Sequence, residues 1–405
     1  MKAAGGRIDS LTDNLGNILT WSQALREIAR SADIVVLHTF PNDVVPLIAF
    51  ADKRSMPPIV LLNLSDHKFW VGASVSDIVV DQRLSGAKLT ETRRGIDKGR
   101  RGFLPIVLPL ISREVSISEA KAQIGLPPDT ILLLSVARHS KYAPFRGYGS
   151  KFNDLVLPDS ILPVLEQHSN VALVVIGPES SDRWERASQT VSGRISALGR
   201  REDTVDFYQA ADIYLDSFPF ASITSCLEAG SYGLPLVTCY PYSDVSAVLG
   251  ADTPALENNI LRVRNKSEYI SVVTHLVEDP GYRSRIGKDT RESIVSVHTG
   301  TNWNRYLRDL YLQAANISST TKIEYGEDQK TITELDLLSL EIDVLKDGEN
   351  MIYQDHMRLL PIDLRVNLWL KMLKEHHVFR PSLLFSEWLA VQLIRARSSM
   401  LTKSI

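Results

Sequence analysis

The 405-residue sequence lacks several features that would place it in a common class of protein. It contains only two cysteines, Cys226 and Cys239, which excludes a disulfide framework and a CxxC metal site and fits a reducing compartment. No run of eighteen apolar residues exists, and the start MKAAGGRIDS has no apolar signal core. We therefore expect a cytoplasmic protein without a membrane span.

The net charge and the absence of two phosphate-binding motifs argue against further classes of protein. The formal net charge of -3 gives no reason to expect a nucleic-acid surface. The basic stretch TRRGIDKGRRG (92–102) is interpreted as a solvated turn. Neither GxxxxGK[ST] nor GxGxxG occurs, which argues against a P-loop nucleotidase and a nicotinamide enzyme.

Short apolar runs separated by amphipathic segments dominate the first three quarters of the chain. Continuous apolar strands that alternate with helices are typical of parallel sheets covered on both faces, so the sequence predicts an α/β fold. The expected strands are DIVVLH (33–38), PIVLLNL (58–64), SDIVV (76–80), LPIVLPL (104–110), TILLLSVA (130–137), VALVVIG (171–177), DIYLDSF (212–218) and LPLVTCY (234–240).

We expect two doubly wound domains that face a cleft, followed by a helical appendage. The predicted limits are 1–108, 109–315 and 331–405, and Ser116 is expected to cap the first helix of the second domain. The first domain is short for a doubly wound half, which predicts that it is reduced or lacks its first strand–helix units. The last helix is amphipathic with a basic end; we expect it to pack on its own protein, and peripheral membrane contact stays open.

Candidate ligand-binding residues follow three neighbouring strands of the second domain. Ligands of open parallel sheets bind beyond the carboxyl ends of the strands. Arg138 and Lys141 follow one strand, Gly177 ends the next, and a hydroxyl-rich helix start (Ser222, Thr224 and Ser225) follows a third. Helix N-termini favour phosphate, and Arg and Lys supply the opposing cations, so the sequence predicts a nucleoside diphosphate site.

One acid completes this set. Glu228 lies one turn inside the same helix, and its carboxylate is expected to point back toward the crevice, where it can accept the two hydroxyls of a ribose. Each feature has a plainer explanation, because Ser and Thr are common helix caps and loop cations are commonly solvated. Their joint placement on one sheet favours the binding site.

Residues 109–315 resemble the donor-binding domain of GT-B-type glycosyltransferases, which use nucleotide-activated sugars. The segment SVARHSKY is similar to the family's strand-end Arg and Lys pair, and ISALGRREDTVDFYQAADIYLDSFPFASITSCLEAGSYGLPLVT to its run of Gly, helix, strand, loop, acid and G-x-P-x-V. The resemblance implies a UDP- or GDP-linked hexosyl or N-acetylhexosaminyl donor. It places Gly199 and Arg200 near the base, Thr224 and Ser225 near the phosphates, and Glu228 at the ribose.

The resemblance also shows departures. The large retaining family 4 carries a second acid eight residues before the ribose-binding Glu, and that position is Phe220 here. The FPFASITSCLEA loop is closer to protein O-GlcNAc transferases, which invert configuration, so the sequence leaves the stereochemistry open. No D-x-D triplet occurs, which argues against a metal-dependent GT-A enzyme. We therefore expect no metal and no cofactor beyond the nucleotide-sugar co-substrate.

The first domain is expected to hold the acceptor and any general base. His38 and the pair Asp66 and His67 follow two of its strands, and a neutral imidazole can accept a hydroxyl proton. His67 is the preferred catalytic candidate, and Asp66 would orient it. The acceptor itself, whether saccharide, lipid or protein, is not specified by the sequence.

Two alternatives to a glycosyltransferase remain open at this point. A sugar-nucleotide epimerase on the same two-sheet plan would convert the donor without an acceptor. A non-catalytic nucleotide-sugar-binding or scaffold subunit would fit the short first domain and the helical tail.

Overall fold

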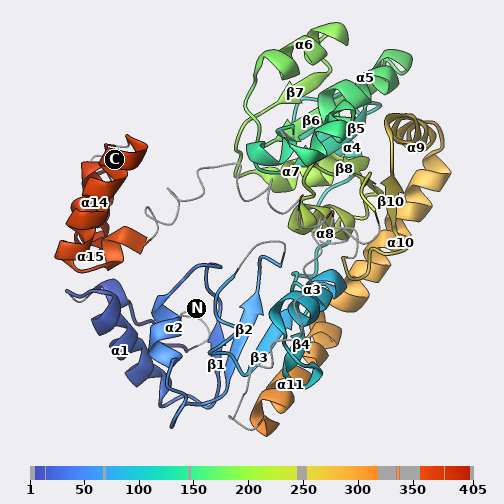
Figure 1. The fold of residues 1–405 in the computed structure, drawn as a ribbon. Helices are drawn as coiled ribbons and strands as arrows, with labels where there is room; N and C mark the ends of the chain where they lie inside the picture. The colour runs from blue at the N-terminus through green and yellow to red at the C-terminus, as the bar shows by residue number, and fades with distance from the viewer. Residues whose placement is uncertain are drawn as a thin grey trace. The chain divides into compact units, whose positions relative to one another are not determined.

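The computed structural model describes residues 5–13, 15–66, 70–144, 147–243, 253–317, 334, 337, 356–377 and 379–401. Two sheets organise this part of the chain (Figure 1). Both domains are parallel-sheet α/β domains, as the apolar strand pattern predicts, and helices follow at the C-terminal end. The fold class inferred from the sequence is confirmed.

The first sheet has four strands in the order β1-β2-β3-β4. Val35 of β1 pairs with Ile59 of β2 in parallel register. Helix α1 begins after Asn17, whose side chain accepts hydrogen bonds from the backbone N–H groups of Leu19 and Thr20. The strands are β1 (Val35–Leu37), β2 (Ile59–Asn63), β3 (Ile78–Asp81) and β4 (Arg101–Phe103), and the helices are α1 (Ile18–Ala29), α2 (Val45–Phe50) and α3 (Leu84–Arg94).

The second sheet has six parallel strands in the order β10-β9-β8-β5-β6-β7. Strands β5 and β6 are apolar almost throughout because both of their faces are covered, and Leu133 and Leu173 are fully buried. The strands are β5 (Ile131–Val136), β6 (Val171–Ile176), β7 (Ile195–Ala197), β8 (Ile213–Leu215), β9 (Leu236–Cys239) and β10 (Ile260–Val263).

The strand order fixes where this sheet can bind a ligand. The first strand, β5, lies in the middle; the chain adds β6 and β7 on one side and then returns to add β8, β9 and β10 on the other. The order therefore reverses between β5 and β8, and ligands of doubly wound sheets bind in the crevice at that point, beyond the carboxyl ends of the strands.

Helices cover both faces of the second sheet. Helix α5 packs against α6 and α9, while α4 packs against α7 and α8 against α10. Ser116 caps α4 as predicted, with a reciprocal hydrogen bond from its backbone N–H to the Glu119 carboxylate. The helices are α4 (Ile117–Gln123), α5 (Leu157–Gln167), α6 (Asp182–Thr190), α7 (Thr204–Ala210), α8 (Ile223–Ser231), α9 (Lys266–Glu278), α10 (Pro280–His298) and α11 (Gly300–Asn316).

The C-terminal helices are α14 (Ile362–His376) and α15 (Glu387–Leu401), and α15 together with the turn before α14 packs on the N-terminal helix α1. Leu359 and Trp388 join the buried cluster that contains Trp21 of α1. An ion pair of 2.7 Å joins Arg395 to Asp13. The last helix therefore packs on its own protein, as the sequence suggested.

One predicted strand is wrong. Residues 104–110 are irregular, because Pro105 and Pro109 lack the N–H groups that a central strand needs. The segment is held by other contacts: the backbone N–H of Leu104 donates to the Asp81 carbonyl, and that of Leu108 to the His298 carbonyl. Three strands, β4, β7 and β10, were not predicted.

The chain divides into two compact units, and the division passes through β3. The first contains the described residues up to Val79, residues 313–317 and the helices after residue 356; the second contains Val80–Leu312. The domain limits predicted from the sequence stay predictions. No helix in the described part of the chain has the length and apolar character needed to cross a membrane.

Candidate functional site

The candidate site lies in the second unit, where the strand order reverses between β5 and β8. Lys141 lies in the 3-10 turn His139–Tyr142 that follows β5. Its Nζ atom donates a hydrogen bond of 2.8 Å to the carbonyl of Ala221, the residue before the N-cap of α8. The ammonium also lies 4.9 Å from the centroid of the Phe220 ring. The predicted cation and the predicted helix start are therefore in direct contact.

The electrostatic surroundings of Lys141 are mixed. Burial lowers the pKa of its ammonium, Asp216 and Cys226 act to raise this pKa, and the positive charges of Arg138 and Arg83 lower it. Arg138, at the start of the same turn, is exposed. Two neighbouring cations therefore follow one strand end, and the charge of Arg138 disfavours that of Lys141.

The start of α8 has no side-chain cap. Its N-cap residue, Ser222, makes no side-chain capping hydrogen bond; the Ser222 hydroxyl instead lies 3.1 Å from the Ser225 hydroxyl. Thr224, in the first turn, is exposed. The positive end of the helix dipole and two exposed or half-buried hydroxyls therefore face the end of the sheet to which Lys141 also contributes.

Glu228 lies one turn further along α8 and is half-buried. Partial burial raises the pKa of its carboxyl, and the nearby Tyr208 hydroxyl opposes that rise. Tyr208 is fully buried in α7 and stacks on Tyr232, with 5.6 Å between the ring centroids. The stacked tyrosines thus lie beside the half-buried Glu228 carboxyl.

Gly177 and Gly199 connect the ends of β5, β6 and β7. The backbone N–H of Gly177 donates to the Gly199 carbonyl at 2.7 Å, and the N–H of Gly199 donates to the Pro178 carbonyl at 2.8 Å. A Cβ atom at Gly177 would lie 1.7 Å from the Ala137 carbonyl oxygen, and the φ angle of Gly177 is +116°. Only glycine fits this position, so Gly177 shapes the strand ends. Arg200, after Gly199, is exposed.

Asp216 is a functional candidate that the sequence analysis missed. It follows β8, is 4% exposed, and accepts hydrogen bonds from the backbone N–H groups of Ser217 and Ser222 and from the Thr238 hydroxyl. Burial raises the pKa of its carboxyl, while the Ser222 hydrogen bond and the Lys141 charge lower it. Asp216 is thus hydrogen-bonded to the end of β8, to the start of α8 and to the neighbouring strand β9.

The acceptor-side candidates lie in the first unit. His38 directly follows β1 and is exposed, and Asp66 follows β2 at intermediate exposure. His67 lies outside the described residues. A shallow hollow between the two loops is lined mainly by apolar side chains, among them Phe40, Leu64 and Trp70.

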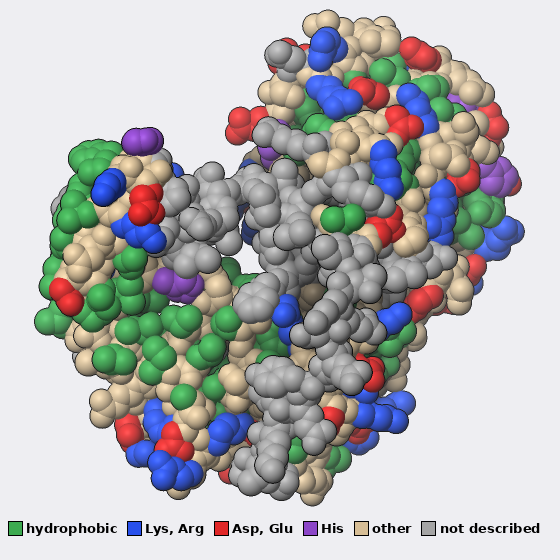
Figure 2. Space-filling view, in the orientation of Figure 1, with side chains coloured by type: hydrophobic (Ala, Val, Ile, Leu, Met, Phe, Trp, Pro, Cys, Tyr) green, Lys and Arg blue, Asp and Glu red, His purple; other side chains and the backbone are tan. Residues whose placement is uncertain are grey.

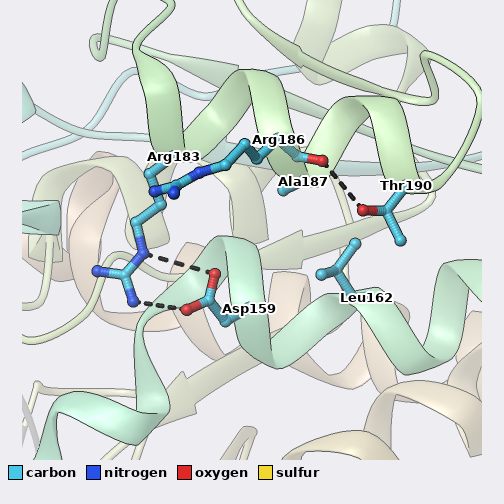
Figure 3. Close-up of a pocket in the computed structure, with 6 residues that line it drawn as sticks. All are labelled: Asp159, Leu162, Arg183, Arg186, Ala187 and Thr190. Atoms are coloured by element: carbon cyan, nitrogen blue, oxygen red, sulfur yellow. Dashed lines mark hydrogen bonds and ion pairs between the residues drawn. The ribbon is translucent and has the colours of Figure 1, made fainter.

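A larger hollow of about 350 Å³ lies between α5 and α6 in the second unit (Figure 3). Its lining includes Arg183, Arg186 and Asp159, but the guanidinium of Arg183 is ion-paired with the Asp159 carboxylate at 2.6 Å. None of the predicted donor-binding residues lines it. In the described part of the chain, no three His, Cys, Asp or Glu side chains are grouped as metal ligands would be.

The fold is that of GT-B-type glycosyltransferases. A glycosyltransferase from Rickettsia africae ESF-5 superimposes with a TM-score of 0.56 and 13% identity, covering 77% of this chain and 85% of that one. Anabaena HepE in complex with UDP and glucose gives 0.52 at 14% identity, covering 74% and 82%. Sucrose-phosphate synthase from Thermosynechococcus elongatus gives 0.52 at 18%, covering 73% and 77%. No family model and no curated protein matches the sequence.

Proposed function

We propose that the chain is a metal-independent glycosyltransferase that moves a hexosyl or N-acetylhexosaminyl group from a UDP- or GDP-linked donor to an acceptor. The observation that carries the proposal is the contact between Lys141 and the loop that starts α8, at the crevice where the strand order reverses. The fold supports it, because related folds include HepE in complex with UDP and with UDP-glucose.

In this proposal the donor diphosphate binds Arg138, Lys141 and the start of α8 with Thr224 and Ser225. Glu228 accepts the ribose hydroxyls, and Gly199 and Arg200 lie along the base. When the bond between the sugar and the phosphate breaks, its electron pair leaves on the diphosphate, and the cations and the helix dipole stabilise that charge. The acceptor oxygen bonds to the anomeric carbon, and in an inverting reaction its proton would pass to His67, with Asp66 adjacent in sequence and His38 after the neighbouring strand β1.

The partners proposed are a nucleotide sugar and a saccharide, lipid or protein acceptor, in cytoplasmic carbohydrate biosynthesis without a nucleic acid. The decisive experiment has two stages. UDP, GDP and a panel of nucleotide sugars are first screened by thermal shift, since a ligand at one hundred times its dissociation constant stabilises the fold by about 2.7 kcal/mol. Turnover of the best donor is then measured with candidate acceptors, with and without a chelator.

Lys141→Met is the critical variant, and Lys288→Met, on the exposed side of α10, is its matched control. Loss of one charge that meets the leaving group lowers turnover about 10²-fold to 10³-fold, whereas the control leaves it unchanged. Isomerised donor without an acceptor would identify an epimerase. Donor binding without any product would identify a binding subunit, and no binding of any nucleotide would reject the proposal.

A further inference from the structure

The C-terminal helices α14 and α15 have several large apolar side chains exposed to solvent. Ile362, Val366 and Leu370 follow one another at intervals of four on α14, so they share one face of that helix. Ile362 is 57% exposed and Leu370 51%, and on α15 Ile394 is 64% exposed. Figure 2 shows hydrophobic side chains gathered over these helices. We define the C-terminal apolar surface by its six most characteristic residues: Ile362, Val366, Leu370, Phe379, Leu393 and Ile394.

This surface is separate from the side of the helices that faces the protein. The inner side is formed by the buried cluster of Met357, Met372 and Leu383 and by Trp388, which packs toward α1. Arg365 is buried and donates to the Leu384 carbonyl at 2.9 Å. Phe379 packs edge-to-face on Trp369, with 5.7 Å between the ring centroids, whereas the other five residues of the C-terminal apolar surface lie outside the buried clusters.

The charge around the surface has one predominant sign. Residues 356–401 contain seven Lys and Arg residues against three acids, in a chain whose formal net charge is -3. Lys371, Lys374 and Arg380 are exposed, and only Lys371 has an acidic neighbour, Glu375, at 3.8 Å within the described residues. Arg365 is buried and Arg395 is paired with Asp13, so the exposed cations beside the apolar face include Lys371, Lys374 and Arg380. Such cations repel a second copy of the same face and attract an anionic surface.

We propose that the C-terminal apolar surface binds anionic lipid bilayers peripherally. Helices that present an apolar face with Lys and Arg beside it lie in the plane of the headgroups, where apolar insertion and attraction to anionic lipids add together. The inference goes beyond the proposed transfer reaction, because it concerns a different surface in the first unit. It brings the enzyme to the membrane surface without a spanning helix.

The test uses the full chain and sedimentation with vesicles. Binding is measured to vesicles of phosphatidylcholine alone and of phosphatidylcholine mixed with phosphatidylglycerol. We expect binding to the mixed vesicles, and weakening as salt rises from about 0.1 M to about 1 M, where the Debye length falls from about 10 Å to about 3 Å. The double variant L370E/I394E and the charge variant K371E/K374E should each weaken binding by at least about ten-fold.

The matched control is V107E/V205E, which introduces two carboxylates at exposed valines of the second unit and should bind as the wild type does. Circular dichroism and melting temperature verify that each variant folds. Absence of binding to anionic vesicles, or equal loss in the control, would overturn the proposal. Sedimentation velocity gives the remaining outcome: a dimer that L370E/I394E dissociates, without lipid binding, would assign the surface to a second copy of the chain and reject the membrane.

Discussion

The Oδ1 atom of Asp216 accepts a hydrogen bond of 2.9 Å from the backbone N–H of Ser222, the residue that begins α8. The same carboxylate accepts from the Thr238 hydroxyl of the neighbouring strand at 3.1 Å. One buried acid therefore fixes the position of the helix start relative to the sheet, and with it the geometry of the proposed anion site.

Replacement of Asp216 should affect stability and donor binding together. Asp216→Ala leaves buried donors without an acceptor, and we expect a loss of about 2–4 kcal/mol in the free energy of unfolding. Thr238→Val removes a single donor and should cost less, about 1 kcal/mol. Urea denaturation gives both values, and equal effects of the two variants would show that Asp216 does not organise the loop.

Glu228 should give opposite effects on stability and on ligand binding. Burial raises the pKa of its carboxyl above the ordinary value of 4.5. The free energy of unfolding therefore falls as pH rises from the unfolded-state pKa to the folded-state pKa, and this loss is complete above the folded-state pKa. Glu228→Gln removes that penalty, and we expect a higher melting temperature at neutral pH without ligand. The same change should weaken UDP binding, because the carboxylate no longer accepts the ribose hydroxyls.

The pH dependence follows from the same shift. Wild-type affinity for UDP should fall as pH is lowered through a range above 4.5, since protonation removes the carboxylate. In the Glu228→Gln variant, UDP affinity still depends on the protonation of the UDP phosphate, but no longer on that of the Glu228 carboxyl. The difference between the two calorimetric profiles therefore isolates Glu228, and identical profiles would remove it from the ribose site.

Gly177 and Gly193 provide a matched pair for testing the strand-end geometry. Both have positive φ angles, +116° and +83°, but a Cβ atom at Gly193 meets nothing within 4 Å, whereas one at Gly177 meets the Ala137 carbonyl. Gly193→Ala should cost about 1–2 kcal/mol from backbone strain alone. Gly177→Ala should cost more than about 4 kcal/mol, because backbone must move. Similar unfolding free energies for the two variants would contradict this reading.

His298 should be essential for holding the segment between the two sheets. It is fully buried, with Nδ1 2.7 Å from the Ile106 carbonyl and Nε2 3.0 Å from the Pro254 carbonyl. His298→Phe leaves both carbonyls without this partner, and we expect a loss of about 2–4 kcal/mol. His275→Phe, at an exposed position of α9, serves as the control. A neutral effect at His298 would mean that the segment is held by its other contacts.

The sequence predicted the fold well because long buried strands have a strong signature. Strands β5 and β6 stand out as uninterrupted apolar runs, and Ser116 signals the start of α4. Short strands carry less signal: β7 has three residues, and β10 includes the exposed Arg262. Pro105 and Pro109 already argued against a strand at residues 104–110.

The sequence predicted the residues at the surface of the candidate site better than the buried residue that positions them. Lys141 and the start of α8 were expected to meet because parallel strands end at one edge of a sheet. Asp216 was missed because DIYLDSF looks like one strand, while β8 ends at Leu215 and the acid directly follows it. An acid inside an apolar run is the signal that would have found it, since a buried carboxylate requires donors.

The packing of α15 on α1 sets an order for the making of this protein. Trp21 emerges from the ribosome long before its partners Leu359 and Trp388, which lie far later in the sequence. Helix α2 can pack on α1 early, but the part of the apolar side of α1 that α15 covers stays exposed until residue 388 has been translated. A ribosome that stalls short of residue 388 leaves a nascent chain with that side unshielded, and such a chain is a natural client for chaperones and proteases.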